Sequence, residues 1–407
     1  MMTIEQLEYG IVNYGTPLYV FDLDKIARTV ANLRKKTDGV AQLCFAMKAN
    51  PFLTKQMAAL TDRIEVCSVG EYKICRDLQI SPEKLLISGV LKEWAELEWI
   101  INECHGACTL TVESVSQFCY IAEWCRIHQE PLRVYLRLTS GNQFGMDEQM
   151  IQYLISARDI YPLVKIEGIH FFSGTQKRSF DIIRGELLRL DQFLRELEEE
   201  NGFIIQALEY GPGIDVPYFE GQSDRRDDEI DGLCEVLRGL NWKGRITLEM
   251  GRFFVGDAGY YMTTVRDIKT NDQKNYCIVD GGIHQINYDG QIKGMYQPHL
   301  SIIPQKDAGE YQEWTICGSL CTVNDVLIRQ IRMKSLKIGD VLIFQRTGAY
   351  AMTEGMALFL SHALPKVTFF SNESGWRLIR PEQPTYVFNM ERDVEDGNIN
   401  GNFRGCQ

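Results

Sequence analysis

One lysine in this sequence stands in a setting that favours chemistry. Lys48 directly follows the apolar run Cys44–Met47 and shortly precedes Pro51. Burial lowers the pKa of an amine, and a neutral amine can attack a carbonyl carbon to form a Schiff base. A lysine at the mouth of a fold is usually only a solvated charge, so the prediction depends on what the fold gathers around Lys48.

Two later segments carry groups that suit an anion. In Gly211-Pro212-Gly213 the glycines would let backbone N–H groups approach a phosphate, although such a tripeptide is more often a plain turn. Further on, Glu249 and Arg252 follow another β-rich run, although Glu249 could equally form a salt bridge at the end of a strand. Neither segment alone is specific for an anion site. Together they predict one only if the fold places both opposite Lys48.

Eight short β-rich runs alternate with amphipathic segments between about residues 40 and 250. The runs are 43–47, 64–67, 85–87, 110–113, 133–138, 165–171, 207–210 and 245–249. Parallel strands need helical crossovers, so eight strand–helix units predict an α/β fold with a (β/α)8 TIM barrel. A doubly wound open sheet is the alternative, but no Gly-x-Gly-x-x-Gly follows the first run. Because the catalytic groups of a barrel collect at the carboxyl ends of its strands, we expect Lys48, Gly213 and Glu249 on one face.

The pattern changes after about residue 259, where β-rich runs follow one another without helices between them. These runs cover 260–270, 275–279, 313–317, 326–333 and 340–345, and turn residues separate them. We therefore predict a barrel domain over residues 25–258 and a C-terminal all-β domain over residues 259–390, which residues 1–24 join through a strand at 17–21. Residues 391–407 are rich in Gly, Asn and acidic residues, which predicts a flexible tail.

The composition excludes several classes of partner. With 43 basic and 55 acidic residues among 407, the net charge of −12 opposes binding to nucleic acid or to an anionic membrane. No apolar run reaches the ~18 residues of a membrane span, and the amino terminus has no signal-peptide pattern. The twelve cysteines are scattered, many of them in apolar stretches, which favours reduced thiols in a cytoplasmic protein. The closest pairs, Cys104/Cys108 and Cys317/Cys321, lack the further ligands of a zinc site, so no metal is predicted.

Several motifs recur in an order that resembles one enzyme family. They are Phe45-Ala46-Met47-Lys48-Ala49-Asn50, Ser68-Val69-Gly70-Glu71, Ile87-Ser88-Gly89, Glu249-Met250-Gly251-Arg252, Val279-Asp280-Gly281-Gly282, Gly318-Ser319-Leu320-Cys321 and Gly348-Ala349-Tyr350. From Tyr14 to about Ser361 the chain thereby resembles the fold-type III pyridoxal phosphate (PLP) decarboxylases of the diaminopimelate and ornithine decarboxylase family. The resemblance implies an alanine racemase-like barrel with a C-terminal β domain, and pyridoxal 5'-phosphate as the cofactor.

The resemblance also implies a role for each matching residue. Lys48 would hold PLP as a Schiff base, Glu249 would pair with the pyridine nitrogen, and Cys321 would protonate the substrate carbon after carbon dioxide leaves. The other cofactor contacts would be Phe172 over the ring, and Thr175, Gly211, Gly213, Gly251, Arg252 and Tyr350 toward the phosphate. Cys321 would reach the cofactor of the other subunit, which implies a homodimer with active sites shared between subunits.

Departures from the family pattern carry the information about the substrate. Phe172 stands where the family has the histidine that covers the PLP ring, and a phenyl ring can stack there but offers no proton. Thr322 replaces the glutamate that follows the acid cysteine of diaminopimelate decarboxylases, and Gln297 replaces the arginine of their distal clamp. Asp325 would then meet a distal amine, or serve as a cap or as a surface residue.

The resemblance therefore implies PLP-dependent decarboxylation of an amino acid. The pattern is closest to the natural-product branch that acts on acylated or carrier-protein-bound amino acids. The alternative within the family is the diaminopimelate decarboxylase of lysine biosynthesis. A racemase is disfavoured because Glu249 and Cys321 occupy decarboxylase positions. From another class, a PLP-free regulatory homologue that binds a protein partner is disfavoured because Lys48, Arg252 and Tyr350 are retained.

Overall fold

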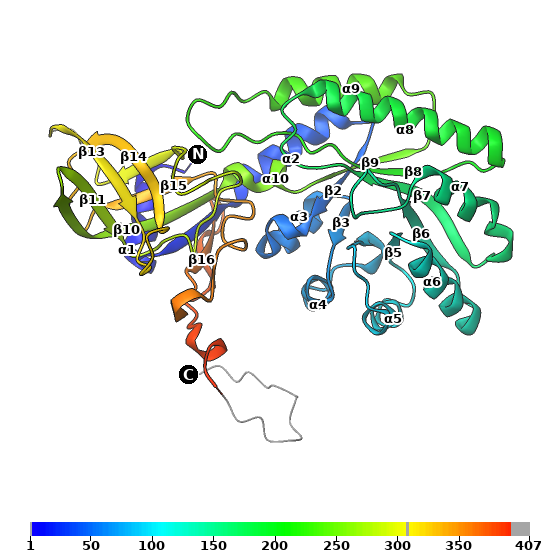
Figure 1. The fold of residues 1–407 in the computed structure, drawn as a ribbon, viewed down its shortest axis with the longest axis horizontal. Coiled ribbons are helices and arrows are strands. Elements are labelled where there is room, and N and C mark those ends of the chain that lie inside the picture. The colour runs from blue at the N-terminus through cyan, green and yellow to red at the C-terminus, as the bar shows by residue number, and fades with distance from the viewer. Residues whose placement is uncertain (1, 307–308, 392–407) are drawn as a thin grey trace.

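A closed barrel of eight parallel strands occupies the middle of the chain (Figure 1). The computed structural model describes residues 2–306 and 309–391. The barrel strands are β2 (Gln42–Ala46), β3 (Arg63–Val66), β4 (Leu85–Ile87), β5 (Thr109–Val112), β6 (Leu132–Arg137), β7 (Val164–Phe172), β8 (Ala207–Gly211) and β9 (Arg245–Met250). Neighbours pair in chain order, and β9 closes the barrel by pairing in parallel with β2. The predicted (β/α)8 barrel is confirmed.

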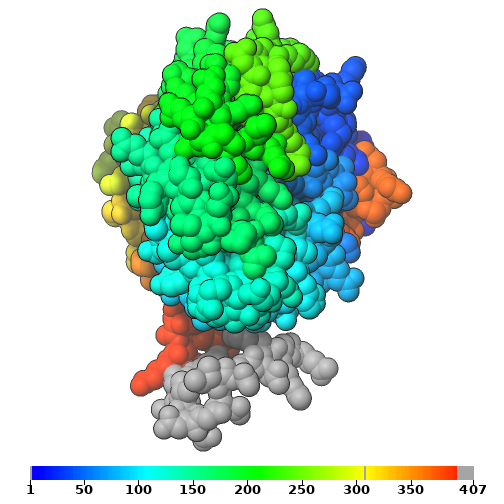
Figure 2. All heavy atoms as spheres, turned by 90° about the vertical axis from the view of Figure 1, so that its right-hand side faces the viewer, coloured from blue at the N-terminus to red at the C-terminus, as the bar shows by residue number. Residues whose placement is uncertain are grey.

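Helices connect the strands and cover the barrel from outside. They are α2 (Leu23–Thr37), α3 (Thr54–Leu60), α4 (Val69–Asp77), α5 (Trp94–Glu103), α6 (Val115–His128), α7 (Glu148–Ser156), α8 (Phe180–Asn201), α9 (Arg226–Gly239) and α10 (Arg252–Val255), with α1 (Ile4–Tyr14) at the amino terminus. In α8, buried Leu187, Leu190 and Leu194 recur at helical spacing, so an apolar stripe packs inward while the charged face stays in water. Figure 2 looks onto the right-hand side of Figure 1, where side chains from successive segments of the chain form one continuous surface.

Short 3-10 helices complete the connections. They are η1 (Met47–Ala49), η2 (Pro51–Leu53), η3 (Pro82–Lys84), η4 (Arg158–Ile160), η5 (Gly256–Ala258), η6 (Phe359–Ser361) and η7 (Tyr386–Phe388). The first of them, η1, follows β2 directly and carries the lysine singled out from the sequence. None of the helices in the described ranges is long and apolar enough to span a membrane.

A second, mixed sheet lies beside the barrel (Figure 1). Its strands are β1 (Leu18–Asp22), β10 (Gly259–Asn271), β11 (Lys274–Val279), β12 (Leu300–Ile303), β13 (Tyr311–Cys317), β14 (Val326–Lys334), β15 (Val341–Gln345), β16 (Lys366–Ser371) and β17 (Gly375–Arg380). Their hydrogen-bonded order is β14-β13-β11-β10-β1-β16-β17, and β15 pairs with both β10 and β12. The strand expected at residues 17–21 is β1, which lies between β10 and β16, so the amino terminus contributes to this sheet.

Four elements of the sheet domain are not expected from the sequence pattern. They are α1, β12, β16 and β17. Three of the four residues of β12 and all six of β17 are only half-buried or exposed, so neither shows the alternation that marks a strand. The tail expected at 391–407 lies outside the described residues, apart from Glu391.

Candidate active site

The amine of Lys48 lies at the carboxyl end of β2 and faces a carboxylate on the next strand. Nζ lies 3.1 and 3.0 Å from the two carboxylate oxygens of Glu65. Burial lowers the pKa of the amine, but the charge of Glu65 raises it, and the net pKa of Lys48 lies well above its usual range. The expectation that burial leaves Lys48 with a lowered pKa is therefore wrong, because a carboxylate is buried beside it.

Glu65 also accepts hydrogen bonds from two uncharged donors. Its Oε1 accepts from Ser88 Oγ at 2.5 Å and from Cys67 Sγ at 2.8 Å. Burial raises the pKa of the Cys67 thiol, so the sulfur keeps its proton. Side chains from the ends of β2, β3 and β4 thus form one cluster around the lysine. Glu65 was not among the residues predicted from the sequence, although a carboxylate inside an apolar strand is a signal that could have marked it.

A second buried carboxylate lies on β9, the other neighbour of β2. Glu249 Oε2 lies 2.9 Å from Nε2 of His170 on β7, and both side chains are almost fully enclosed. Burial raises the pKa of Glu249, but the hydrogen bond and charge of His170, with the charge of Lys48 behind them, outweigh burial and lower the pKa below its usual range. Glu249 therefore stays ionised and can accept a hydrogen bond from a protonated ring nitrogen. His170 was not predicted as a site residue.

The loops after β7 and β8 approach each other so closely that glycine is required. A Cβ on Gly213 would lie 2.0 Å from the carbonyl oxygen of Gly174, and Gly213 has a φ of +64°. The Lys177 N–H donates to the carbonyl oxygen of Gly213 at 2.9 Å, which holds the two loops together. A Cβ on Gly211 would lie 2.5 Å from the ring of Phe172, so this ring packs on bare backbone. Exposed glycine backbone of this kind suits an anion.

Arg252 and Tyr350 close the same end of the site. The guanidinium carbon of Arg252 lies 4.6 Å from the centroid of the Tyr350 ring, and Nη1 donates to the Tyr218 hydroxyl at 2.5 Å. The buried Nε of Arg252 has no hydrogen-bond partner in the described part of the chain. The Tyr350 N–H donates to the carbonyl oxygen of Ala49 at 2.8 Å, which ties this tyrosine to the turn that carries the lysine. An arginine beside glycine loops suits a phosphate group.

All but one of the predicted cofactor residues line a single cavity. They are Lys48, Phe172, Thr175, Gly213, Glu249, Gly251, Arg252 and Tyr350. The exception, Gly211, lies against Phe172. These groups fit pyridoxal phosphate: an amine for its aldehyde, an ionised carboxylate for its ring nitrogen, an aromatic ring for its face, and an arginine with glycine backbone for its phosphate.

The residues predicted to act on the substrate lie elsewhere. Cys321 and Thr322 follow β13 on a loop of the sheet domain, and Cys321 is exposed. Gln297 is exposed too, and its carbonyl oxygen accepts the Glu220 N–H at 2.8 Å. None of these three side chains lines the cavity around Lys48 in its own chain.

Asp325 is buried and its carboxylate is occupied by backbone. Its Oδ1 accepts the Ile283 N–H at 2.9 Å, and its Oδ2 accepts the Leu320 N–H at 2.8 Å. A Cβ on Gly318 would lie 2.2 Å from the carboxylate, so the backbone encloses it closely. Asp325 therefore caps the loop that carries Cys321, and the expectation that it meets a distal amine stays a prediction.

Comparisons with known proteins cover both the barrel and most of the sheet domain. A family model for the pyridoxal-dependent decarboxylase, C-terminal sheet domain, matches residues 18–348. The chain is 28% identical to the L-glutamyl-BtrI acyl-carrier protein decarboxylase of Niallia circulans, across 93% of this chain and 94% of that protein. It is 24% identical to the 2-((L-alanin-3-ylcarbamoyl)methyl)-2-hydroxybutanedioate decarboxylase of Staphylococcus aureus, across 87% of this chain and 94% of that protein. Its fold is shared with the crystal structure of diaminopimelate decarboxylase from M. jannaschii, with a TM-score of 0.83 at 23% identity over 95% of this chain and 94% of that one.

Proposed function

The chain belongs to the pyridoxal-dependent decarboxylases, and we propose that it removes carbon dioxide from an amino acid whose side chain is acyl-linked to a small molecule or to a carrier protein. The observation that carries this proposal is the lack of charge at the positions predicted to face the distal end of the substrate. Gln297 and Thr322 are neutral, and the carboxylate of Asp325 is held by backbone N–H groups. At these positions a free distal amine or carboxylate would find no charged partner to replace its hydration, whereas a neutral amide or thioester needs none.

Two relatives support the same class of substrate. The name of one relative gives an L-glutamyl group on an acyl-carrier protein as its substrate. The name of the other gives a compound in which a carbamoyl group joins an alanin-3-yl unit to a hydroxybutanedioate. Decarboxylation at the amino-acid carbon requires a free α-amine and a free α-carboxylate. A tethered glutamyl substrate of this chain would therefore be linked through its γ-carboxyl group.

The residues around the cavity suit the cofactor of this family. Pyridoxal phosphate, when bound, supplies an electron sink for the electron pair that remains when carbon dioxide leaves the substrate. Lys48 would hold the cofactor through Nζ, Glu249 would keep its ring nitrogen protonated, and Arg252 would hold its phosphate together with the loops after β7 and β8. Phe172 would cover the ring and exclude water from it.

Proton handling falls to Lys48 and Cys321. Whenever the amine of Lys48 is free, Glu65 stabilises its protonated form, so Nζ can hold a proton close to the reacting carbon. Phe172 offers no proton of its own. Cys321 is the second candidate donor, and its exposed loop suits the cavity of a neighbouring chain.

We further propose that the protein is a cytoplasmic homodimer. Cys321 and Thr322 lie away from the cavity of their own chain, and a second copy would give them a cavity in which to act. All cysteines in the described ranges are free thiols, which supports a reducing compartment.

Carbon dioxide release from a panel of substrates tests the proposed function. Holoenzyme would be assayed with γ-L-glutamylmethylamide, L-glutamate, L-ornithine and meso-diaminopimelate, with the Lys48→Ala variant as the control. We expect turnover of the γ-amide and little turnover of the compounds with a free distal charge. Efficient turnover of meso-diaminopimelate with none of the γ-amide would overturn the proposal and identify a diaminopimelate decarboxylase instead.

A further inference from the structure

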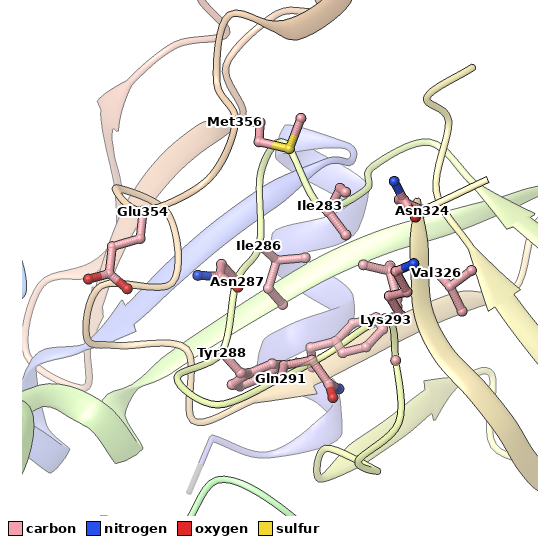
Figure 3. Close-up of a pocket in the computed structure, with 13 residues that line it drawn as sticks. Ile283, Ile286, Asn287, Tyr288, Gln291, Lys293, Asn324, Val326, Glu354 and Met356 are labelled. Atoms are coloured by element: carbon pink, nitrogen blue, oxygen red, sulfur yellow. The ribbon is translucent and has the colours of Figure 1, made fainter. Parts of the chain in front are cut away.

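A cavity of about 250 Å³ lies in the sheet domain, and none of the proposed cofactor residues lines it (Figure 3). Its floor is apolar and includes Ile286, Tyr288, Val326, Leu327 and Phe344. These residues come from the segment after β11, the start of β14 and the end of β15. The volume has room for roughly eight heavy atoms or more.

No residue lines both this cavity and the cofactor site, but two contacts connect the residues around them. The ring of Tyr288 in the cavity floor lies edge-on to the ring of Tyr218, with centroids 5.7 Å apart, and Tyr218 is the residue that accepts the hydrogen bond of Arg252. On another side, the Asn287 N–H donates at 2.8 Å to the carbonyl oxygen of Ala351, the residue after Tyr350. The cavity therefore adjoins the side of the cofactor site on which Tyr350 lies.

Four polar side chains on the cavity wall have no hydrogen-bond or ion-pair partner in the described part of the chain, and those of Lys293, Asn324 and Glu354 are exposed to solvent. They are the amides of Asn287 and Asn324, the ammonium of Lys293 and the carboxylate of Glu354. Figure 3 shows Glu354 and Lys293 on opposite sides of the cavity. Asn287 lies toward Glu354, and Asn324 lies toward Lys293. The Glu354 N–H donates to the carbonyl oxygen of Tyr350 at 3.0 Å, so Glu354 marks the end nearer the cofactor site and Lys293 marks the far end.

We propose that this cavity receives the amide-bearing arm of a tethered substrate, with a phosphate at the far end of the arm beside Lys293; the inference rests on the proposed function. The apolar floor would take the methylene and methyl groups of the arm, and Asn287 and Asn324 would pair with its amide groups. Lys293 would meet the phosphate, which lies away from the carboxylate of Glu354. A phosphopantetheine-type arm has this sequence of groups.

A series of substrates that differ only in the arm tests the inference on the holoenzyme. The series consists of γ-L-glutamylmethylamide, the γ-L-glutamyl amide of aminopantetheine, and the 4'-phosphate of that amide. We expect KM to fall about tenfold from the first compound to the second, because two amide hydrogen bonds and buried apolar groups are added. The phosphate should lower KM about threefold further, as expected of one partly exposed ion pair.

Two variants locate the effect. Lys293→Glu should abolish the gain from the phosphate, whereas Lys274→Glu, an equal charge change at an exposed position of β11, should keep it. Val326→Trp fills the cavity, and it should raise KM for the pantetheine amide about tenfold while leaving the methylamide unchanged. Turnover of the methylamide by Val326→Trp shows that this variant is folded.

The outcomes separate this inference from the proposed function. Equal KM values for all three compounds in the wild-type enzyme would overturn the cavity assignment, and so would an equal rise for both amides in Val326→Trp. If no γ-glutamyl amide is decarboxylated, the proposed function fails, and the cavity is then tested by calorimetric titration with phosphopantetheine alone. Binding that weakens in Lys293→Glu but not in Lys274→Glu would support the cavity, and no binding would overturn it.

Discussion

A single carboxylate on α8 fixes the loop that faces the phosphate end of the site, and its removal is expected to weaken cofactor binding. Glu186 accepts hydrogen bonds from Lys177 Nζ at 2.6 Å, from the Tyr210 hydroxyl at 2.7 Å and from Ser173 Oγ. Ser173 and Lys177 flank Thr175, which lines the cofactor cavity. The change considered is Glu186→Gln, which keeps the shape of the side chain and removes its charge.

The size of the effect follows from the contacts that are lost. Lys177 is buried and has only Glu186 as an ion-pair partner among the described residues, so the substitution leaves a buried ammonium without its counter-ion. Burial already lowers the pKa of Lys177 against the opposing effect of Glu186, and the variant should lower it further. A hydrogen bond between charged groups contributes about 1.5–3 kcal/mol, and the amide oxygen of glutamine retains part of it. Cofactor binding would then have to order the freed loop again. A net loss of about 2 kcal/mol for this ordering corresponds to a Kd for pyridoxal phosphate that is about 30-fold higher.

The assay is a titration of apoenzyme with pyridoxal phosphate, followed by the visible absorbance of the lysine-bound cofactor. The matched control is Glu148→Gln, which removes the same charge from an exposed ion pair with Arg189 at 2.6 Å and should leave Kd nearly unchanged. Unfolding of each apoenzyme by urea separates a local effect from a general loss of stability. A Kd for Glu186→Gln within twofold of the wild-type value would refute the reasoning, because the loop would then hold its shape without the carboxylate.

Three further predictions follow from single contacts. Gly211→Ala should weaken cofactor binding because its Cβ would lie 2.5 Å from the Phe172 ring, and Phe172→Ala in the same chain should partly restore the affinity measured by the same titration. Burial lowers the pKa of Lys92 to about 8, below its unfolded value of about 10.4, so the unfolded chain binds the extra proton between these pH values. The urea-derived free energy of unfolding should therefore rise from pH 8 to pH 10 more steeply in the wild-type protein than in Lys92→Met, and equal slopes would contradict this. If Cys321 acts in a neighbouring chain, mixing the inactive Lys48→Ala and Cys321→Ala proteins after exchange of subunits should restore about a quarter of wild-type turnover, whereas no recovery would place both residues in one chain.

The barrel is predictable from the sequence because its strands are buried on both faces and appear as short apolar runs. The runs predicted at 133–138 and 245–249 match β6 and β9 to within one residue. The sheet domain is less predictable because strands such as β17 are half-exposed, and their burial depends on neighbours that are distant in the sequence. β1, for example, pairs with β10 and β16, more than two hundred residues away.

The candidate site, too, was only partly predictable from the sequence. Lys48 and Glu249 could be found because each stands at the end of a strand within a recognisable motif. The contact between Lys48 and Glu65 could not, because it joins residues 17 positions apart that meet only when β2 and β3 become neighbours. The direction of the Lys48 pKa was wrong for this reason. The sequence left several roles open for Asp325, because the enclosure of its carboxylate by backbone from two segments is a tertiary property.

The hydrogen bonds around Glu65 explain how this buried carboxylate could lose the ammonium of Lys48 as a neighbour without being left unpaired. If Lys48 held the cofactor through Nζ, it would no longer provide a free ammonium beside Glu65. A buried carboxylate left without donors would cost about 1–3 kcal/mol or more, which would oppose cofactor binding. Ser88 and Cys67 remain hydrogen-bonded to the same carboxylate at 2.5 and 2.8 Å, so Glu65 is never without partners. Loss of both donors in a Ser88→Ala/Cys67→Ala variant should therefore weaken cofactor binding even though neither side chain belongs to the group that would hold the cofactor.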